Sequence, residues 1–270
     1  MDKTLGSGED SSLSYAVTNL QLFNQLISHG LATEDLQRIK NTYELARLLF
    51  SGRFTASGRS QLAHCVRTAS ILASWHAPPH VIAAGLIHNV YKNGDFGDGT
   101  RKISGPKKTV LQDLLGQDIE TEAANFVRIK WNEHNVSLFK RGEGPLTRNT
   151  VLLRLADGLE HNLDGGLFYD HKAMQRRRGT EPWILEAAKC LEIPGLVEEL
   201  EKLKLVQESH SPLAEFHEKF GAYGGSDVLP PSCSRKFSLK LLHVFHSWLP
   251  GRGQTWFIRR LRRLIQHGRV

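Results

Sequence analysis

The chain contains little cysteine: Cys65, Cys190 and Cys233 are the only three in its 270 residues. They lie far apart and form no CxxC pair, so neither a disulfide framework nor a thiolate zinc site is indicated. Runs of about 18 apolar residues, which a membrane-spanning helix needs, are also missing. Residues 1–12 lack the basic start and the apolar stretch of a signal peptide. We therefore expect a cytoplasmic protein.

Acidic residues are absent from residues 235–270, which contain nine Lys or Arg. The rest of the chain carries slightly more acidic than basic side chains, so this segment alone accounts for the net positive charge. Its aromatic and aliphatic residues are interleaved with Arg at helical spacing, which predicts a basic amphipathic segment. Such a segment can lie on an anionic membrane surface, which would make the protein peripheral at a membrane. It can also bind a polyanion or dock onto the acidic remainder of the chain, but no motif for specific nucleic-acid recognition is present.

Strand patterns are absent as well. Hydrophobic residues make up 40% of the chain and charged residues 23%, which is typical of globular proteins. Apolar residues recur at helical spacing, whereas no internal repeat or parallel-sheet pattern is present. The sequence therefore predicts an all-α fold, with helices over residues 15–28, 33–50, 61–75, 78–91, 107–115, 118–132, 147–163, 183–191 and 195–205.

Composition divides the chain into four segments. Residues 1–13 are polar and rich in Gly and Ser, which predicts a disordered tail. Residues 14–205 are expected to form the helical domain. Residues 206–234 become rich in Gly and Pro toward their end, which predicts a linker, and residues 235–270 form the basic amphipathic C-terminal appendage.

Polar residues interrupt three strongly apolar helices of the domain. His64 lies in AHCVRTASIL, His88 and Asn89 lie in AAGLIHNVY, and Asp157 lies in LLRLADGLEHN. A buried polar group without a partner costs roughly 1–3 kcal/mol, so these side chains need hydrogen bonds or a metal. Imidazoles and carboxylates that converge from several helices form nitrogen and oxygen metal sites. We predict such a site, and the alternative is core histidines bonded to backbone carbonyls or to Asp157.

The strings ASGRSQLAHCVRTASILA, VIAAGLIHNVY and TVLLRLADGLEHN, within a motif core at residues 55–165, resemble a known family. They look like the RelA/SpoT-type ppGpp hydrolase domain, a branch of the HD phosphohydrolase superfamily. The resemblance implies an HD-domain helical bundle. It also implies a divalent metal ion, typically manganese, held by His64, His88 with Asn89, and Asp157. The implied activity is metal-dependent hydrolysis of a nucleotide or another small phosphate ester.

The sequence departs from this family at the carboxylates beside the metal. The Asp of the family's His-Asp pair is Asn89 here, a neutral side chain that offers a carbonyl oxygen but no charge, so cation affinity should fall. The Glu-Asp pair thought to position the attacking water is replaced by Lys92 and Asn93, and neither is a good general base. Asp95 and Asp98, slightly further along, are the candidate catalytic residues that would orient the water instead.

Two further departures concern substrate recognition. The arginine of the family's LADR string is Gly158 here, and the arginine before the Ser-Gly turn is replaced by Thr55. We therefore do not expect recognition of a guanine nucleotide. The side chains that could bind substrate phosphates, or simply face water, are Lys92, Lys107, Lys108 and Arg154.

The family's His-Asn pair is shifted by one position, to His161 and Asn162. Asp157, His161 and Asp164 share one helix face, at i, i+4 and i+7. His161 could therefore serve as a replacement ligand, or this face could be a solvated polar stripe. His134, in WNEHN, leaves the same two readings open.

Two functions of other classes remain beside a phosphohydrolase. The loss of the metal-bridging and water-positioning carboxylates favours a catalytically inactive HD domain that binds a ligand or acts as a regulatory module. An HD-type iron oxygenase is disfavoured, because the Asp replaced by Asn89 is the residue that bridges the two irons there.

Overall fold

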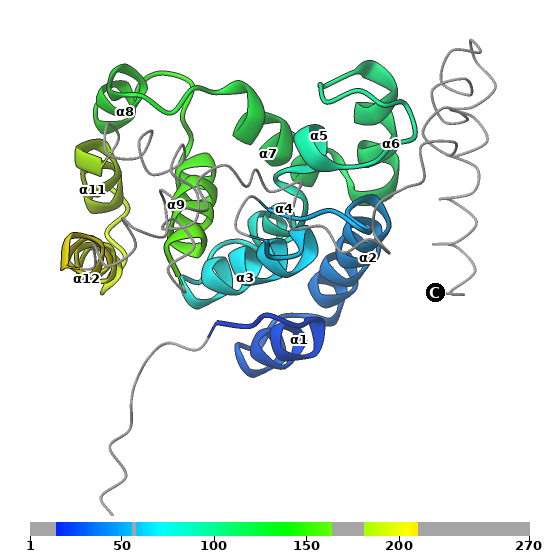
Figure 1. Cartoon of the computed structure of the whole chain (residues 1–270), viewed down its shortest axis with the longest axis horizontal. Coiled ribbons are helices and arrows are strands. Elements are labelled where there is room, and N and C mark those ends of the chain that lie inside the picture. Colours follow the sequence, from blue (N-terminus) through cyan, green and yellow to red (C-terminus); the bar gives the residue numbers. More distant parts are fainter. Residues whose placement is uncertain (1–14, 56–57, 164–180, 210–270) are drawn as a thin grey trace, which may run out of the picture.

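The computed structural model describes residues 15–55, 58–163 and 181–209, and these residues confirm the all-α fold (Figure 1). They contain no strand, only an isolated bridge between Phe54 and Ser60. The helices are α1 Asn19–Ser28, α2 Thr33–Leu49, α3 Gln61–Ser74, α4 Pro79–Ile87, α5 Val90–Asn93, α6 Gly105–Leu115, α7 Gln117–Arg128, α8 Glu133–Lys140, α9 Arg148–Asn162, α11 Glu181–Lys189 and α12 Leu196–Ser209.

Side-chain caps fix the starts of the two helices that carry most of the site. The Ser60 hydroxyl accepts a hydrogen bond from the amide of Ala63 at the start of α3, at 3.1 Å. The Thr147 hydroxyl accepts from the amide of Thr150 at the start of α9, also at 3.1 Å. Each cap satisfies an amide that has no partner within its helix, so the register of both helices is set by local sequence.

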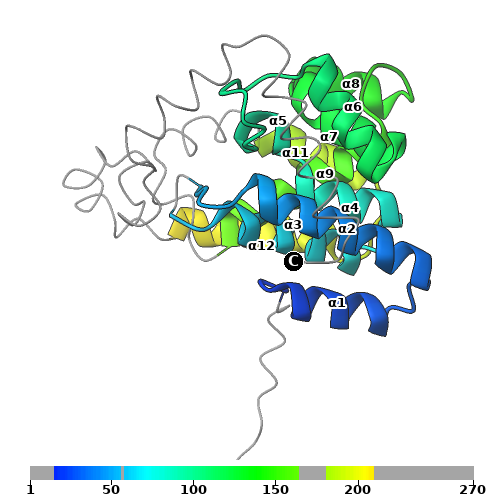
Figure 2. The same ribbon diagram turned by 90° about the vertical axis from the view of Figure 1, so that its right-hand side faces the viewer.

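Helices α3 and α4 form the centre of the bundle (Figures 1 and 2). They approach closely because Gly85 of α4 has no side chain: a Cβ there would lie 2.8 Å from Leu72 Cδ1 and 3.2 Å from the Cα of Ala69. Every residue of α4 from Val81 to Ile87 is buried. Helices α2 and α7 cover α4, and α9 packs on α3. The site residues therefore lie on core helices.

The structure differs from the expected helices at several places. Helix α1 begins at Asn19 instead of residue 15, and α7 ends at Arg128 instead of residue 132. The helix expected over residues 78–91 ends at Ile87, and a new turn begins after Asn89, whose carbonyl accepts from the amides of Lys92 and Asn93. The break leaves His88 and Asn89 at the end of α4. Helix α8 was not predicted, because of its residues only Val136 is buried, too few to give a periodic pattern.

Other parts of the sequence prediction lie mostly outside the described residues. They include the tail at residues 1–13, the basic segment at residues 235–270 and the linker, except residues 206–209, which continue α12. Within the described part of the chain, no helix combines the length and the apolar character needed to cross a membrane.

Candidate metal centre

Three polar side chains from different helices meet inside the bundle. His64 lies on α3, His88 follows the last residue of α4, and Asp157 lies on α9. The Nε2 atoms of the two histidines are 3.1 Å apart. Asp157 Oδ1 lies 3.3 Å from His64 Nε2 and 3.2 Å from His88 Nε2. Both imidazoles are fully buried, and the Asp157 side chain is 17% exposed, so three of the four predicted ligands meet with the carboxylate toward the outside.

The other nitrogen of each imidazole is held by an acceptor. His64 Nδ1 donates to Glu160 Oε2, and His88 Nδ1 donates to the carbonyl oxygen of Gly85 at 2.8 Å. These partners place the ring hydrogen on Nδ1, so each Nε2 presents a lone pair to the centre. Metal-binding histidines are oriented in this way by a carboxylate or a backbone carbonyl.

The protonation states of His64 and Asp157 are those that a metal cation requires of its ligands. Burial lowers the pKa of His64 to about 3, so its ring carries no second proton near neutral pH. Burial alone would raise the pKa of Asp157, but His161 and the bonds to His64 and His88 hold it well below its usual range. The Nε2 atoms of His64 and His88 and an oxygen of ionised Asp157 therefore face one another, and a cation could replace the hydrogen bonds among them.

The spacing of these atoms also fits a metal ion. Ligand atoms about 2.1 Å from one ion are about 3.0–3.4 Å apart at octahedral to tetrahedral angles. The three separations of 3.1, 3.2 and 3.3 Å fall in this range. The donor set of imidazole and carboxylate is one that divalent transition metals accept. These residues could hold a divalent metal ion.

Asn89 reaches the same centre but presents its amide nitrogen. Its Nδ2 lies 2.7 Å from His88 Nε2 and 3.3 Å from His64 Nε2, as a donor to both lone pairs. An amide NH2 group is not a metal ligand. The ligation predicted for Asn89 would require its carboxamide to turn by about 180° so that the carbonyl oxygen faces the centre.

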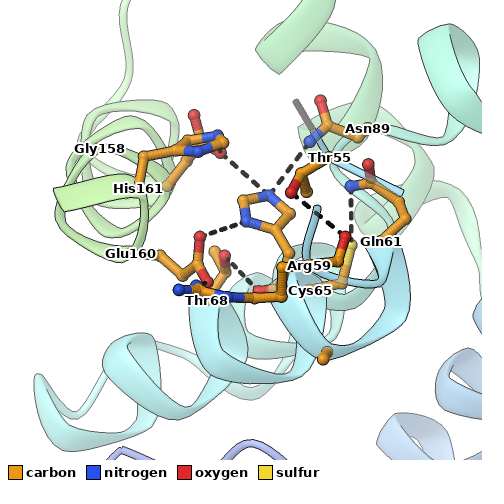
Figure 3. Close-up of polar contacts among 12 residues, drawn as sticks. Thr55, Arg59, Gln61, Cys65, Thr68, Asn89, Gly158, Glu160 and His161 are labelled. Atoms are coloured by element: carbon orange, nitrogen blue, oxygen red, sulfur yellow. Dashed lines mark hydrogen bonds and ion pairs between the residues drawn. The ribbon is translucent and has the colours of Figure 1, made fainter. Parts of the chain in front are cut away.

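His161 lies one turn after Asp157 on α9 and borders the same atoms. Its Nε2 is 3.4 Å from Asp157 Oδ1, and its ring centroid is 4.6 Å from that of His64. One ligand atom each from His64, Asp157 and His161 can be chosen so that all three lie within 4.8 Å of one another. Figure 3 shows His161 on one side of the central ring and Asn89 on the other. Asp164 lies outside the described residues.

Glu160 and Arg59 support the centre, although the sequence analysis did not select them as site residues. Glu160 is 1% exposed, and its two oxygens bind His64 Nδ1 and Arg59 Nη1. The carboxylate thus fixes the His64 ring while the guanidinium compensates its charge (Figure 3). The one sequence signal was a Glu three residues after Asp157 on an apolar helix.

A second group of potential ligand atoms includes Cys65, with His64 and His88, again within 4.8 Å. The Cys65 thiol accepts from Gln61 Nε2 at 3.7 Å, and burial raises its pKa. Because the thiolate rather than the thiol binds metals, this group fits an ion less well than the group with Asp157.

Two basic side chains lie near Asp157. Burial and the charge of Arg154 lower the pKa of Lys92, and the charge of Asp157 opposes this. Arg154 Nη2 donates to the carbonyl oxygens of Phe126 and Ile129, and its guanidinium lies 4.2 Å from the Phe126 ring centroid. Its Nε is buried and has no hydrogen-bond partner among the described residues. The guanidinium is therefore enclosed with one donor unsatisfied by the described residues.

A cavity of about 170 Å³ lies beside Asp157 and Arg154. Gly158 lines it at the position of the family's arginine, and a Cβ there would meet nothing within 4 Å in the described part of the chain. Most of the wall is apolar. The lining residues are Trp131, Arg154, Leu155, Asp157, Gly158, Leu159, Asn162, Ile184 and Leu200.

Comparison with known proteins adds a family without an assigned activity. Residues 47–130 match the domain of unknown function DUF6817. The matched stretch contains α3 to α7, and so His64, His88 and Asn89, but not α9 with Asp157. No curated protein matches the chain. Neither comparison assigns an activity to the residues of this site.

The two carboxylates predicted to orient water are bound within the loop after α5. Asp95 accepts from the amide of Gly97 at 3.0 Å and pairs with Arg53 at 3.5 Å. Asp98 accepts from the amide of Thr100 at 3.0 Å and pairs with Lys107 at 3.1 Å. The role of Asp95 and Asp98 in orienting water stays a prediction that these contacts do not favour.

The other candidates from the sequence have local partners. Asn93 donates to Gln61 Oε1 at 3.1 Å, and the Thr55 hydroxyl donates to the carbonyl of Arg59 at 3.2 Å. Lys107 is buried against Asp98, and exposed Lys108 lies 3.9 Å from Glu120. His134 is exposed on α8. None of these contacts involves His64, His88 or Asp157.

Proposed function

We propose that this chain is a divergent HD-type protein that acts as a metal-dependent phosphohydrolase on a nucleotide or another small phosphate ester. One observation carries the proposal: the Nε2 atoms of His64 and His88 and Asp157 Oδ1 face one another at 3.1–3.3 Å. His64, His88 and Asp157 would hold the cation, for which the resemblance implies manganese. Such a cation supplies Lewis acidity to a phosphoryl group and promotes ionisation of a water near neutral pH.

The charges around the centre support an anionic substrate. Lys92 and Arg154 each interact electrostatically with Asp157, so both add positive charge near the centre. Arg154 Nε has no hydrogen-bond partner in the part of the chain that the structure describes, and guanidinium groups bind phosphate oxygens well. A phosphate ester would place its negative charge between these cations and the metal.

The cavity beside Asp157 would receive the rest of the substrate. Its volume of about 170 Å³ and its wall of Trp131, Leu155, Leu159, Ile184 and Leu200 suit a small, largely apolar group. Gly158 leaves space where the family's arginine would stand. The pocket thus favours a small phosphate ester over a guanine nucleotide.

The direct test is turnover of a panel of phosphate esters by the full chain with manganese or zinc added. We expect phosphate release that is abolished by Asp157→Asn, reduced by Lys92→Met, and unchanged by His134→Gln on the exposed face of α8. Metal binding without turnover of any ester would contradict the phosphohydrolase proposal.

The second candidate is an inactive HD domain that binds a ligand, and the positions of the missing acids favour it. Asn93 carries an amide, which cannot act as a base, and the Asp98 carboxylate is paired with Lys107. If this alternative is correct, Asn89→Asp will restore no turnover, while a phosphorylated ligand will still raise the melting temperature of the wild-type chain.

A further inference from the structure

We propose that His161 is a fourth metal ligand and takes the place of the carboxylate that is missing at position 89. The centre would then consist of three imidazoles, from His64, His88 and His161, and the Asp157 carboxylate. This rests on the metal centre of the proposed function but not on phosphate-ester hydrolysis.

The geometry of α9 brings His161 to the centre. Residues at i and i+4 lie on one helix face, and His161 Nε2 is 3.4 Å from Asp157 Oδ1. The same oxygen lies 3.3 and 3.2 Å from the Nε2 atoms of His64 and His88. Three imidazole nitrogens therefore surround one carboxylate oxygen.

The exposure of His161 distinguishes it from the other two histidines. Its side chain is 32% exposed, whereas His64 and His88 are fully buried. Figure 3 places it on α9, against the central ring and opposite Asn89. Its partial exposure leaves the His161 ring more room to move than the two buried rings have.

The donor set determines which metal is preferred. Carboxylate-rich sites suit manganese and magnesium, whereas imidazole-rich sites suit zinc and other later transition metals. Replacement of a carboxylate at position 89 by an imidazole at position 161 removes one negative charge and adds one nitrogen ligand. Zinc binds most nitrogen and oxygen sites more tightly than manganese, and an imidazole ligand from His161 would widen this difference in affinity.

A purely supporting role for His161 makes a different prediction. As a hydrogen-bond donor to Asp157, it would only hold the carboxylate in place, and its removal would weaken every metal to a similar extent. As a ligand, its removal weakens zinc much more than manganese.

The test uses the full chain, stripped of metal with a chelator and titrated with zinc or manganese against a chromogenic competitor. We expect wild-type protein to bind zinc at least about 100-fold more tightly than manganese. His161→Gln should lower zinc affinity by more than about 100-fold, beyond the roughly 10–100-fold effect of a residue that only orients a ligand. Manganese affinity should fall by a much smaller factor than zinc affinity.

Cobalt gives a readout that is independent of affinity. We expect the visible absorption of the cobalt-loaded wild-type chain to weaken and shift in His161→Gln, because a nitrogen ligand is lost. His134→Gln is the matched control and should leave both readouts unchanged. Addition of Asn89→Asp to His161→Gln should restore metal binding, but with manganese now favoured relative to the wild type.

The inference is overturned if His161→Gln leaves both the zinc affinity and the cobalt spectrum unchanged. The metal-free variant should have the melting temperature of the metal-free wild type, which shows that it is folded. An equal loss of zinc and manganese affinity would assign His161 the supporting role instead. The inference is separable from the proposed function, because zinc binding that depends on His161 without any turnover sustains it and refutes the phosphohydrolase.

Discussion

Glu160 orients the His64 ring through one carboxylate oxygen and binds Arg59 through the other. This pairing with Arg59 joins residues 101 positions apart and exists only because α9 packs on α3. His64, His88 and Asp157 could be selected from the sequence as candidate site residues because a polar residue on an apolar helix is conspicuous, whereas Glu160 and Arg59 could not. Helix-end glutamates normally face water, so the sequence alone favours the wrong environment for Glu160.

Glu160→Gln should weaken metal binding without removing a ligand. We expect a loss in affinity of about 10–100-fold, because His64 loses the carboxylate that orients it and raises its basicity. We also expect a lower free energy of unfolding, by roughly 3 kcal/mol, since the largely buried Arg59 would lose the carboxylate charge of Glu160. Competition titration and urea denaturation measure the two effects, with exposed Glu133→Gln as control. Metal affinity equal to that of the wild type would contradict the role given to Glu160.

His64 should make the stability of the metal-free chain depend on pH. The pKa of folded His64 is about 3, whereas an unfolded histidine titrates near 6.5. Between these values the unfolded state binds more protons, so the free energy of unfolding falls as pH decreases from about 6.5 toward 4. The free energy of unfolding, measured by urea denaturation across this pH range, should change less with pH for His64→Gln than for the wild type or His134→Gln. Identical slopes in all three proteins would exclude this assignment.

Among the helices, periodic apolar residues predicted α2, α3, α7 and α9 closely, because long amphipathic or buried segments leave a clear pattern. The break between α4 and α5 was not predictable from this pattern. Residues Val81 to Ile87 are buried on all sides, so the sequence gives no face whose interruption marks the end of the helix. That break places His88 and Asn89 at the centre.

Gly85→Ala should disturb both stability and the metal centre. The added Cβ would meet Leu72 and the backbone of Ala69, which must shift, at a cost of roughly 1–3 kcal/mol. The movement of α4 relative to α3 would separate His88 from His64, so metal affinity should also fall.

Gly158→Ala is the matched control: its Cβ meets nothing within 4 Å in the described part of the chain. We expect the control to raise stability by about 0.5–1 kcal/mol, since alanine favours helix. Equal melting temperatures for Gly85→Ala and the wild type would show that this contact is not tight.

For the whole molecule, the all-α class followed from composition and periodicity. The sequence could not identify a metal or a substrate, because recognition of either depends on distances between helices that no local pattern encodes. The basic segment at residues 235–270 lies outside the described residues, and its partner remains a proposal from charge alone.

We propose that this segment binds anionic membranes. Full-length chain should float with vesicles that contain phosphatidylserine and remain in the soluble fraction with neutral vesicles. Substitution of Arg259, Arg260, Arg262 and Arg263 by Glu should abolish flotation, as should high salt, because the attraction is electrostatic. A wild-type chain that stays soluble with both kinds of vesicle would instead favour docking onto the acidic body.

The most direct test of the metal centre is the metal content of the purified full-length chain after equilibration with zinc and manganese and removal of free ions. We predict about one divalent ion per chain for the wild type and for His134→Gln. Asp157→Asn and His88→Gln should retain almost none, while keeping the helical circular dichroism of the wild type. A wild-type chain that binds neither metal would contradict the account and leave His64, His88 and Asp157 as a hydrogen-bonded core cluster.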